Sequence, residues 1–192
     1  MRAKVAALAL ALASGGGSAW AQGAGAVVDT SFTEPDGDRV LQLSVSIPAP
    51  PADVWRAITT AEGWKRLGVR MASVDFRIGG LIETSYNPDA RPGQPGNIRN
   101  EVVAYVPDRL LVIRNVQAPP GFAHAKEFSQ TVSVFELEPT ADSGTLLRLS
   151  GVGFRPGPAF DDLYGKFAGG NAYTLNRLRE SFSVPPARPP RP

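Results

Sequence analysis

The sequence predicts an α+β domain in which a curved antiparallel sheet wraps round one long C-terminal helix. Segments with period-two alternation of apolar and polar residues follow one another between residues 40 and 151. Apolar residues then recur at helical spacing from Phe160 to Phe182. Strands in series followed by a helix favour α+β over a doubly wound α/β arrangement. A long amphipathic helix needs a curved sheet to bury its apolar stripe, and we expect space between the two.

The first strand is predicted at Val40–Ile47, where every second residue is apolar. Prolines in the segment 48–51 end this strand, and Pro51 suits the first turn of a helix. Val54, Trp55 and Ile58 form the apolar stripe of that helix. A second short helix is expected over Ala61–Leu67.

The remaining strands, about six, are expected to be antiparallel and joined by turns. Gly79-Gly80 is a hairpin signal, 87–96 reads as a loop, and the Pro- and Gly-containing segment 117–127 as a mobile loop. The predicted strands cover Ser73–Ile78, Leu81–Tyr86, Asn97–Val106, Leu110–Asn115, Thr131–Glu138 and Thr145–Gly151.

Both ends of the chain differ in composition from its centre. Residues 1–21 combine Arg2 and Lys4, a short apolar run and the small-x-small end Ala19-Trp20-Ala21, which predicts a cleavable signal peptide. The protein is therefore expected to be exported, to the periplasm or outside a bacterial cell. We expect a flexible leader at 22–37, the folded domain at 38–183 and a Pro-rich disordered tail at 184–192.

Removal of the predicted signal peptide leaves a chain without a basic excess. The full chain has 20 basic and 18 acidic residues, and residues 22–192 have 18 of each. No clustered basic run is present, so a nucleic-acid partner is not expected. Stable membrane insertion is not expected either, and the chain contains no cysteine. The protein is expected to be a monomer or a homodimer.

The order of elements and four motifs resemble the START/Bet v 1-like (SRPBCC) helix-grip superfamily, in the branch of the activator of Hsp90 ATPase. The motifs are the segment Ile47–Thr59 with its proline-capped helix and Val54-Trp55 pair, Asp75–Gly80, Pro107–Leu111, and the hairpin Phe135–Pro139 to Gly144–Leu149. The resemblance implies a deep apolar cavity between sheet and helix, and no single chemistry. Relatives often carry Gly-Trp where this chain has Gly170-Asn171, which suggests a wider cavity.

The residues expected to line this cavity are mostly aromatic. They are Trp64, Phe76, Tyr86, Tyr105, Arg114, Phe135, Phe154, Tyr164, Phe167, Asn171 and Leu175. Asn171 interrupts the apolar stripe, so its amide either meets the polar group of a ligand or bonds nearby backbone at a kink produced by Gly169-Gly170. Arg114 faces inward if Leu110 and Val112 do, and faces solvent if Leu111 and Ile113 face inward.

No complete catalytic set is recognisable, and neither a metal nor a cofactor is expected. His124 is the single histidine and is read as a solvated loop residue. Asp161 and Asp162 suit a helix N-terminus, where the helix dipole favours negative charge. Glu83 is expected on the outer face of its strand, in solvent.

Three functions remain open from the sequence. The leading hypothesis is an exported protein that binds a small hydrophobic or amphipathic molecule. The alternative is a polyketide cyclase/dehydratase-like enzyme, for which Asn171, Arg114, Tyr105 and Glu101 are the candidate polar groups and at least two should enter the cavity. The third is a protein-interaction module like the Hsp90 activators.

Overall fold

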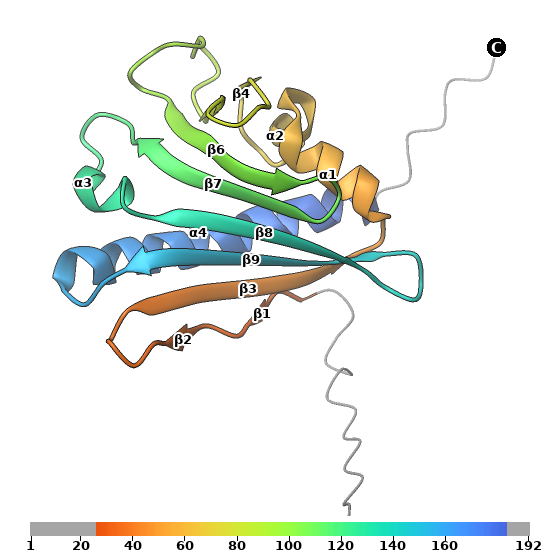
Figure 1. The fold of residues 1–192 in the computed structure, drawn as a ribbon. Helices are drawn as coiled ribbons and strands as arrows, with labels where there is room; N and C mark the ends of the chain where they lie inside the picture. Colours follow the sequence, from red (N-terminus) through yellow and green to blue (C-terminus); the bar gives the residue numbers. More distant parts are fainter. Residues whose placement is uncertain (1–25, 184–192) are drawn as a thin grey trace, which may run out of the picture.

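A curved antiparallel sheet wraps round the long helix α4 in the computed structural model, which describes residues 26–183 (Figure 1). The expected signal peptide and tail lie outside these residues. The helices are α1 (Pro51–Thr59), α2 (Ala61–Arg66), α3 (Ala125–Phe128) and α4 (Pro158–Ser183). The strands are β1 (Val28–Asp29), β2 (Phe32–Thr33), β3 (Arg39–Ile47), β4 (Met71–Val74), β5 (Leu81–Ser85), β6 (Ile98–Val106), β7 (Leu110–Gln117), β8 (Val132–Pro139) and β9 (Thr145–Phe154). The predicted α+β class and helix-grip architecture are confirmed.

The strands of the described chain form one sheet in the order β1-β3-β9-β8-β7-β6-β5-β4, with β2 also paired to β3. The pairing of β3 with β9 brings the first long strand beside the last. Seven strands, β3 to β9, were expected, and two more lie in the segment 22–37 that was expected to be a flexible leader. The expectation of irregular structure is wrong for Val28–Asp29 and Phe32–Thr33, because both pair with the exposed edge of β3.

The two short helices begin as the sequence predicts. Pro51 occupies the first position of α1, where its missing N–H costs no hydrogen bond. Thr60 caps α2, since its Oγ1 accepts a hydrogen bond from the Gly63 amide at 3.1 Å. Gly63 allows the two helices to meet closely: a Cβ there would lie 2.2 Å from the carbonyl oxygen of Ala57.

A β-bulge in β6 changes which of its residues face inward. Glu101 pairs with Arg114 and Val102 with Ile113, but the next pair is Ala104 with Val112, so Val103 is an extra residue. Simple alternation would place Tyr105 on the same face as Glu101. The bulge instead places Tyr105 opposite the buried Leu111 and leaves Glu101 on the outer face.

Helix α4 crosses the concave face of the sheet and packs chiefly on β3 and β9. Its fully buried residues are Leu163, Leu175 and Leu178. The helix is continuous through Gly169-Gly170. Because α4 contacts one half of the sheet most closely, the concave face of the other half, around β5 to β7, is less tightly covered.

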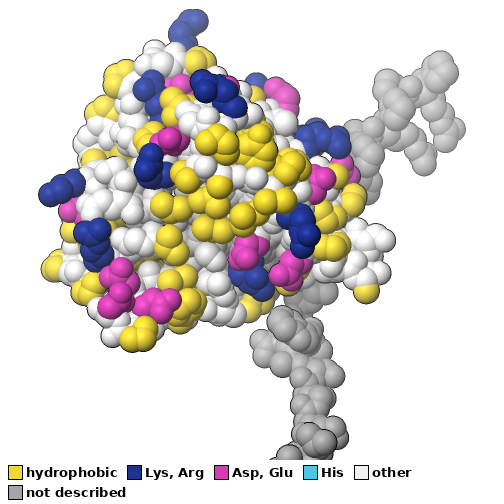
Figure 2. Space-filling model, viewed as in Figure 1, with side chains coloured by type: hydrophobic (Ala, Val, Ile, Leu, Met, Phe, Trp, Pro, Cys, Tyr) yellow, Lys and Arg dark blue, Asp and Glu magenta, His cyan; other side chains and the backbone are white. Residues whose placement is uncertain are grey.

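The opposite face of the sheet carries an apolar surface. Figure 2 shows hydrophobic side chains gathered over β6, β7 and β8 on the face that points away from α4. Val103, Val106 and Val116 are among the exposed hydrophobic residues of β6 and β7. Within residues 26–183, no helix combines the length and apolar character needed to cross a membrane.

Candidate functional site

A cavity of about 240 Å³ lies between the middle of α4 and the concave face of the sheet. The sheet contributes inward-facing residues of β5 to β9, and α2, α3 and α4 supply the other walls. The lining residues are Trp64, Val69, Thr84, Tyr86, Ile98, Asn100, Ile113, Asn115, Phe122, Phe128, Ser133, Phe135, Leu149, Lys166, Phe167, Gly170, Asn171 and Thr174. The position between sheet and C-terminal helix is the one expected from the sequence.

Aromatic rings form much of the apolar wall. Phe128 packs between Phe122 and Phe167, with ring centroids 5.5 and 5.8 Å apart. Trp64 closes another side, and its indole Nε1 donates to the carbonyl oxygen of Ile58 at 2.9 Å. The polar atom of Trp64 is therefore satisfied within the protein, and its ring is free to contact an apolar group.

Gly170 leaves part of the helical wall open. A Cβ built on Gly170 meets no atom within 4 Å, and the residue lines the cavity. Asn171 follows it on the same wall, where the resemblance led us to expect a tryptophan in many relatives. The lack of a side chain at Gly170 and the small amide in place of a tryptophan at Asn171 both leave space between α4 and the sheet.

Two amides of the cavity wall hold atoms that are buried and unpartnered among the described residues. Asn100 of β6 is only 7% exposed, and its Oδ1 lacks a hydrogen-bond partner, as does Nδ2 of Asn171 on α4. Leaving such an atom unpaired costs about 1–3 kcal/mol. The expected alternative for Asn171, a bond to backbone at a kink, is not found for its Nδ2. Each of two opposite walls of the cavity, the sheet and the helix, therefore contains a residue with a buried, unpaired amide atom.

A neighbouring amide on the same face, Asn115, is hydrogen-bonded, unlike the buried atoms of Asn100 and Asn171. Asn115, the cross-strand neighbour of Asn100, donates from Nδ2 to Thr131 Oγ1 at 2.6 Å. Thr131 Oγ1 in turn donates to the Phe128 carbonyl oxygen at 2.8 Å. This chain of bonds ties β7 to the end of α3 and is structural.

The loop beside the cavity contains more regular structure than the sequence suggested. The segment 117–127, expected to be a mobile loop, contains the start of α3, and His124 is only half-exposed. His124 Nε2 lies 3.0 Å from Asp162 Oδ2 at the start of α4, so His124 is not the solvated residue we expected. Asp162 also pairs with Lys166, and this hydrogen bond, with the charges of Lys166 and His124, lowers the pKa of Asp162.

Five of the predicted cavity residues line it: Trp64, Tyr86, Phe135, Phe167 and Asn171. Phe154 and Leu175 are fully buried in the core instead. Tyr164 packs on Phe154 at 5.3 Å, and the Arg39 guanidinium lies 4.4 Å from the centre of its ring.

Phe76 and Tyr105 belong to a separate aromatic cluster. Their rings lie 4.8 Å apart, and each contacts Trp55 of α1, with centroids at 5.7 and 6.3 Å. Phe76 was expected in a strand, but β4 ends at Val74, and Phe76 lies between that strand and the turn at Ile78-Gly79. Their position beside α1, rather than α4, keeps both outside the cavity.

Arg114 lies on the outer face of the sheet. Leu111 and Ile113 face inward, and the Arg114 side chain is 50% exposed and bonded to Glu101. Of the two alternatives drawn from strand alternation, the outward one is therefore correct. Arg114 and Glu101 cannot contribute to the cavity.

Glu83 is outside the cavity, as expected, but it is buried rather than in solvent. The loop after β5 folds over it, so that its Oε1 accepts from the Gly93 amide at 2.9 Å and from Asn97 Nδ2 at 2.6 Å, and Arg99 Nε lies 3.3 Å away. Burial by itself raises the pKa of Glu83, but the bonds from Asn97 and Gly93 and the Arg99 charge outweigh it and hold the pKa below its ordinary value.

Several polar residues of the cavity were not anticipated. They are Thr84, Asn100, Asn115, Ser133, Lys166 and Thr174. A signal was present: Asn100 alternates in phase with Val102, and Asn115 with Ile113. Deciding that these faces point inward requires the pairing of neighbouring strands.

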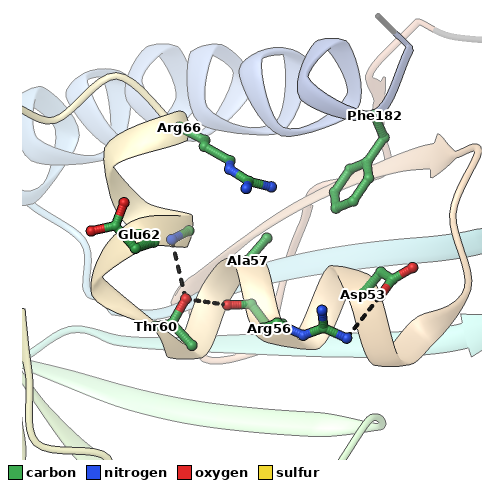
Figure 3. A pocket seen from close by; sticks show the side chains of 8 residues that line it. Asp53, Arg56, Ala57, Thr60, Glu62, Arg66 and Phe182 are labelled. Carbon is green, nitrogen blue, oxygen red and sulfur yellow. Dashed lines mark hydrogen bonds and ion pairs between the residues drawn. The ribbon is translucent and has the colours of Figure 1, made fainter. Parts of the chain in front are cut away.

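A second pocket, of about 270 Å³, lies between α1, α2 and the end of α4 (Figure 3). Figure 3 shows Arg66 and Phe182 extending into it above α1. Its hydrogen-bonding groups are largely paired already: Arg56 bonds Asp53 at 3.0 Å, and Thr60 donates to the Arg56 carbonyl oxygen at 2.7 Å. The cavity under α4 is the stronger candidate site, because it combines apolar walls with unpaired polar atoms.

No group of three or more potential metal ligands occurs within residues 26–183. The class of protein follows from the fold and the cavity: an antiparallel sheet gripping a C-terminal helix, with a hollow between them, defines the helix-grip (START/Bet v 1-like) superfamily. A family model described as "Activator of Hsp90 ATPase homolog 1-like protein" matches residues 48–183, and the chain belongs to this family.

Solved structures support the same fold. The Aha1 dimer from Colwellia psychrerythraea superposes with a TM-score of 0.60 at 19% identity, covering 76% of this chain and 96% of that one. CalU16 from Micromonospora echinospora has a TM-score of 0.60 at 21% identity, covering 87% and 80%. Protein MLL2253 from Mesorhizobium loti has a TM-score of 0.59 at 26% identity, covering 76% and 97%. A search of curated proteins finds no match.

Proposed function

We propose that this protein binds one small hydrophobic or amphipathic molecule in the cavity between the sheet and α4. The observation that supports this most directly is a hollow of about 240 Å³ that combines aromatic walls with polar side chains from both the sheet and α4. Such a combination is typical of small-molecule sites, where apolar walls provide affinity and a few polar groups orient the ligand. Gly170 lies at the exposed rim of the hollow, where an added side chain has room to enter it.

The proposal can be tested by filling the cavity from its helical wall. Gly170→Phe would place a ring in the hollow, whereas Gly169→Phe, one residue earlier, alters a glycine that does not line it and also has no neighbour within 4 Å of a Cβ. The neutral fluorescent probe N-phenyl-1-naphthylamine should bind the wild type and Gly169→Phe similarly. We expect Gly170→Phe to weaken binding at least ten-fold. Equal binding by the two variants, or no binding by the wild type, would contradict the proposal.

The enzyme alternative finds less support in the same residues. Of the four polar groups named for a polyketide cyclase-like reaction, Asn171 alone lines the cavity. Arg114 and Glu101 pair with each other on the outer face, and Tyr105 packs against Trp55. The expected convergence of at least two of these groups is therefore not met, which favours binding over catalysis by this set.

We also propose that the protein acts after export. The support is the pattern of residues 1–21, and it would separate this chain from activators of Hsp90, the role that the family name describes. Expression in a bacterium followed by N-terminal sequencing of the periplasmic fraction tests the point. Export predicts a mature chain that starts at Gln22, whereas an intact Met1 in the cytoplasmic fraction would refute it.

A further inference from the structure

Resting on the proposed function, we propose that the ligand carries a neutral group that both donates and accepts hydrogen bonds, a hydroxyl or a carboxamide, held between Asn100 and Asn171. The two amides come from opposite walls of the cavity, β6 and α4. Each has a buried atom without a hydrogen-bond partner in the described chain. The great majority of buried polar atoms are paired, so two unpaired atoms on residues that line one cavity point to an absent partner.

The chemistry of amides determines the kind of group that fits. Asn100 is unpaired at its oxygen, an acceptor, and Asn171 at its nitrogen, a donor. A hydroxyl can donate to the first and accept from the second. If both amides turn end for end, donor and acceptor exchange places, and a group with both capacities is still matched.

The charges around the cavity argue against an ionised group at this position. Lys166 is the one charged residue among those that line the cavity, and it is bonded to Asp162. A carboxylate between the two asparagines would place negative charge against the side-chain oxygen of Asn100, a residue that is only 7% exposed. A buried charge without a counter-charge is strongly unfavourable, so a neutral group is preferred.

The volume of the cavity and its apolar walls limit the size and polarity of the rest of the ligand. A cavity of about 240 Å³ lies a little below the range of roughly 300–1,000 Å³ typical of small-molecule sites, so the ligand is small. The rings of Phe128, Phe135 and Phe167 border this space. A compound of one or two rings, aromatic or alicyclic, with one hydroxyl or carboxamide substituent satisfies both the size and the two amides.

Three probes of one shape test the inference: 2-naphthol, naphthalene and 2-naphthoate, titrated against the wild-type protein and followed by tryptophan fluorescence. We expect 2-naphthol to bind about ten-fold more tightly than naphthalene, equivalent to about 1.4 kcal/mol, and 2-naphthoate to bind most weakly. In Asn100→Leu and Asn171→Leu the preference for 2-naphthol over naphthalene should fall below about three-fold. Binding of naphthalene itself should be retained, which shows that the variants are folded.

The outcomes separate this inference from the proposed function. Equal affinities of the wild type for 2-naphthol and naphthalene would overturn the inference and leave the apolar cavity as a binding site. Tightest binding of 2-naphthoate would also overturn it. If none of the three probes binds to the wild type, and N-phenyl-1-naphthylamine does not either, the proposed function itself fails. A preference for 2-naphthol that survives in both variants would place the polar contact elsewhere and refute the role of the two amides.

Discussion

Replacing Asn171 by leucine should stabilise the protein in the absence of ligand. Asn171 lies on α4 at a position where the apolar stripe is interrupted, and its Nδ2 is buried without a partner. Leucine restores an apolar residue there and removes the unpaired donor. The change tests whether Asn171 is retained at a cost to stability, as expected for a residue that serves a ligand.

The magnitude follows from two contributions. Relief of an unsatisfied buried donor is worth about 1–3 kcal/mol. The greater helix propensity of leucine adds about 0.5 kcal/mol. Because Asn171 is only partly buried as a residue, we expect the lower part of this range, a gain of about 1–2 kcal/mol in the free energy of unfolding. For a domain of this size that corresponds to a rise of roughly 3–6 °C in Tm.

Urea unfolding followed by circular dichroism measures the change, with Asn176→Leu as the matched control. Asn176 is also partly buried on α4, five residues further along, but it does not line the cavity. The control should gain only the contribution from helix propensity, about 0.5 kcal/mol. If Asn171→Leu is no more stable than Asn176→Leu, or is less stable than the wild type, the unpaired amide of Asn171 does not lower the stability of the protein.

Three further predictions concern the surrounding framework. Because the pKa of Glu83 is lowered by folding, its carboxylate stabilises the protein above the pKa of the unfolded chain, and this contribution is lost as the pH falls through the lower folded value. Urea unfolding between about pH 5 and pH 3 should therefore show a weaker loss of stability in Glu83→Gln than in the wild type; equal slopes would contradict this. Gly153 has φ +93° and a Cβ there would lie 2.4 Å from the Gln130 carbonyl oxygen, so Gly153→Ala should lose at least ~2 kcal/mol more than Gly157→Ala, where φ is also positive but no atom lies within 4 Å. Similar losses in the two alanine variants would show that the clash is relieved. Arg114→Ala should change the free energy of unfolding by less than about 1 kcal/mol and leave probe binding within two-fold, because its ion pair is exposed; a ten-fold loss of binding would place Arg114 at the site after all.

Much of the fold could be predicted from local patterns. Alternation located β3 and β5 to β9, and Pro51 and the residues after it located α1. These patterns work because the period of a strand or helix and the restricted φ of proline are properties of short segments. The two short strands β1 and β2 were missed, since two-residue strands have no detectable period and exist only through pairing with β3.

The candidate site was only partly predictable, and the reason is register. Strand alternation tells which residues share a face but not which face is inward, so Arg114 was left undecided. The bulge at Val103 then reversed the alternation and moved Tyr105 inward, away from Glu101. Glu83 was placed correctly outside the cavity, but strand alternation does not predict that the loop after its strand folds back over it.

The sequence by itself determined the order of the elements, the resemblance to the helix-grip superfamily and the anomaly of Asn171 on an apolar stripe. Tertiary structure alone decided that Asn171 lines the same cavity as Asn100, 71 positions earlier in the chain. The physical reason is that hydrogen-bond satisfaction depends on every atom nearby in space, whereas a sequence pattern records only neighbours along one segment. The phase of Asn100 with Val102 can therefore be read from β6 alone, but whether its amide is paired depends on the complete fold.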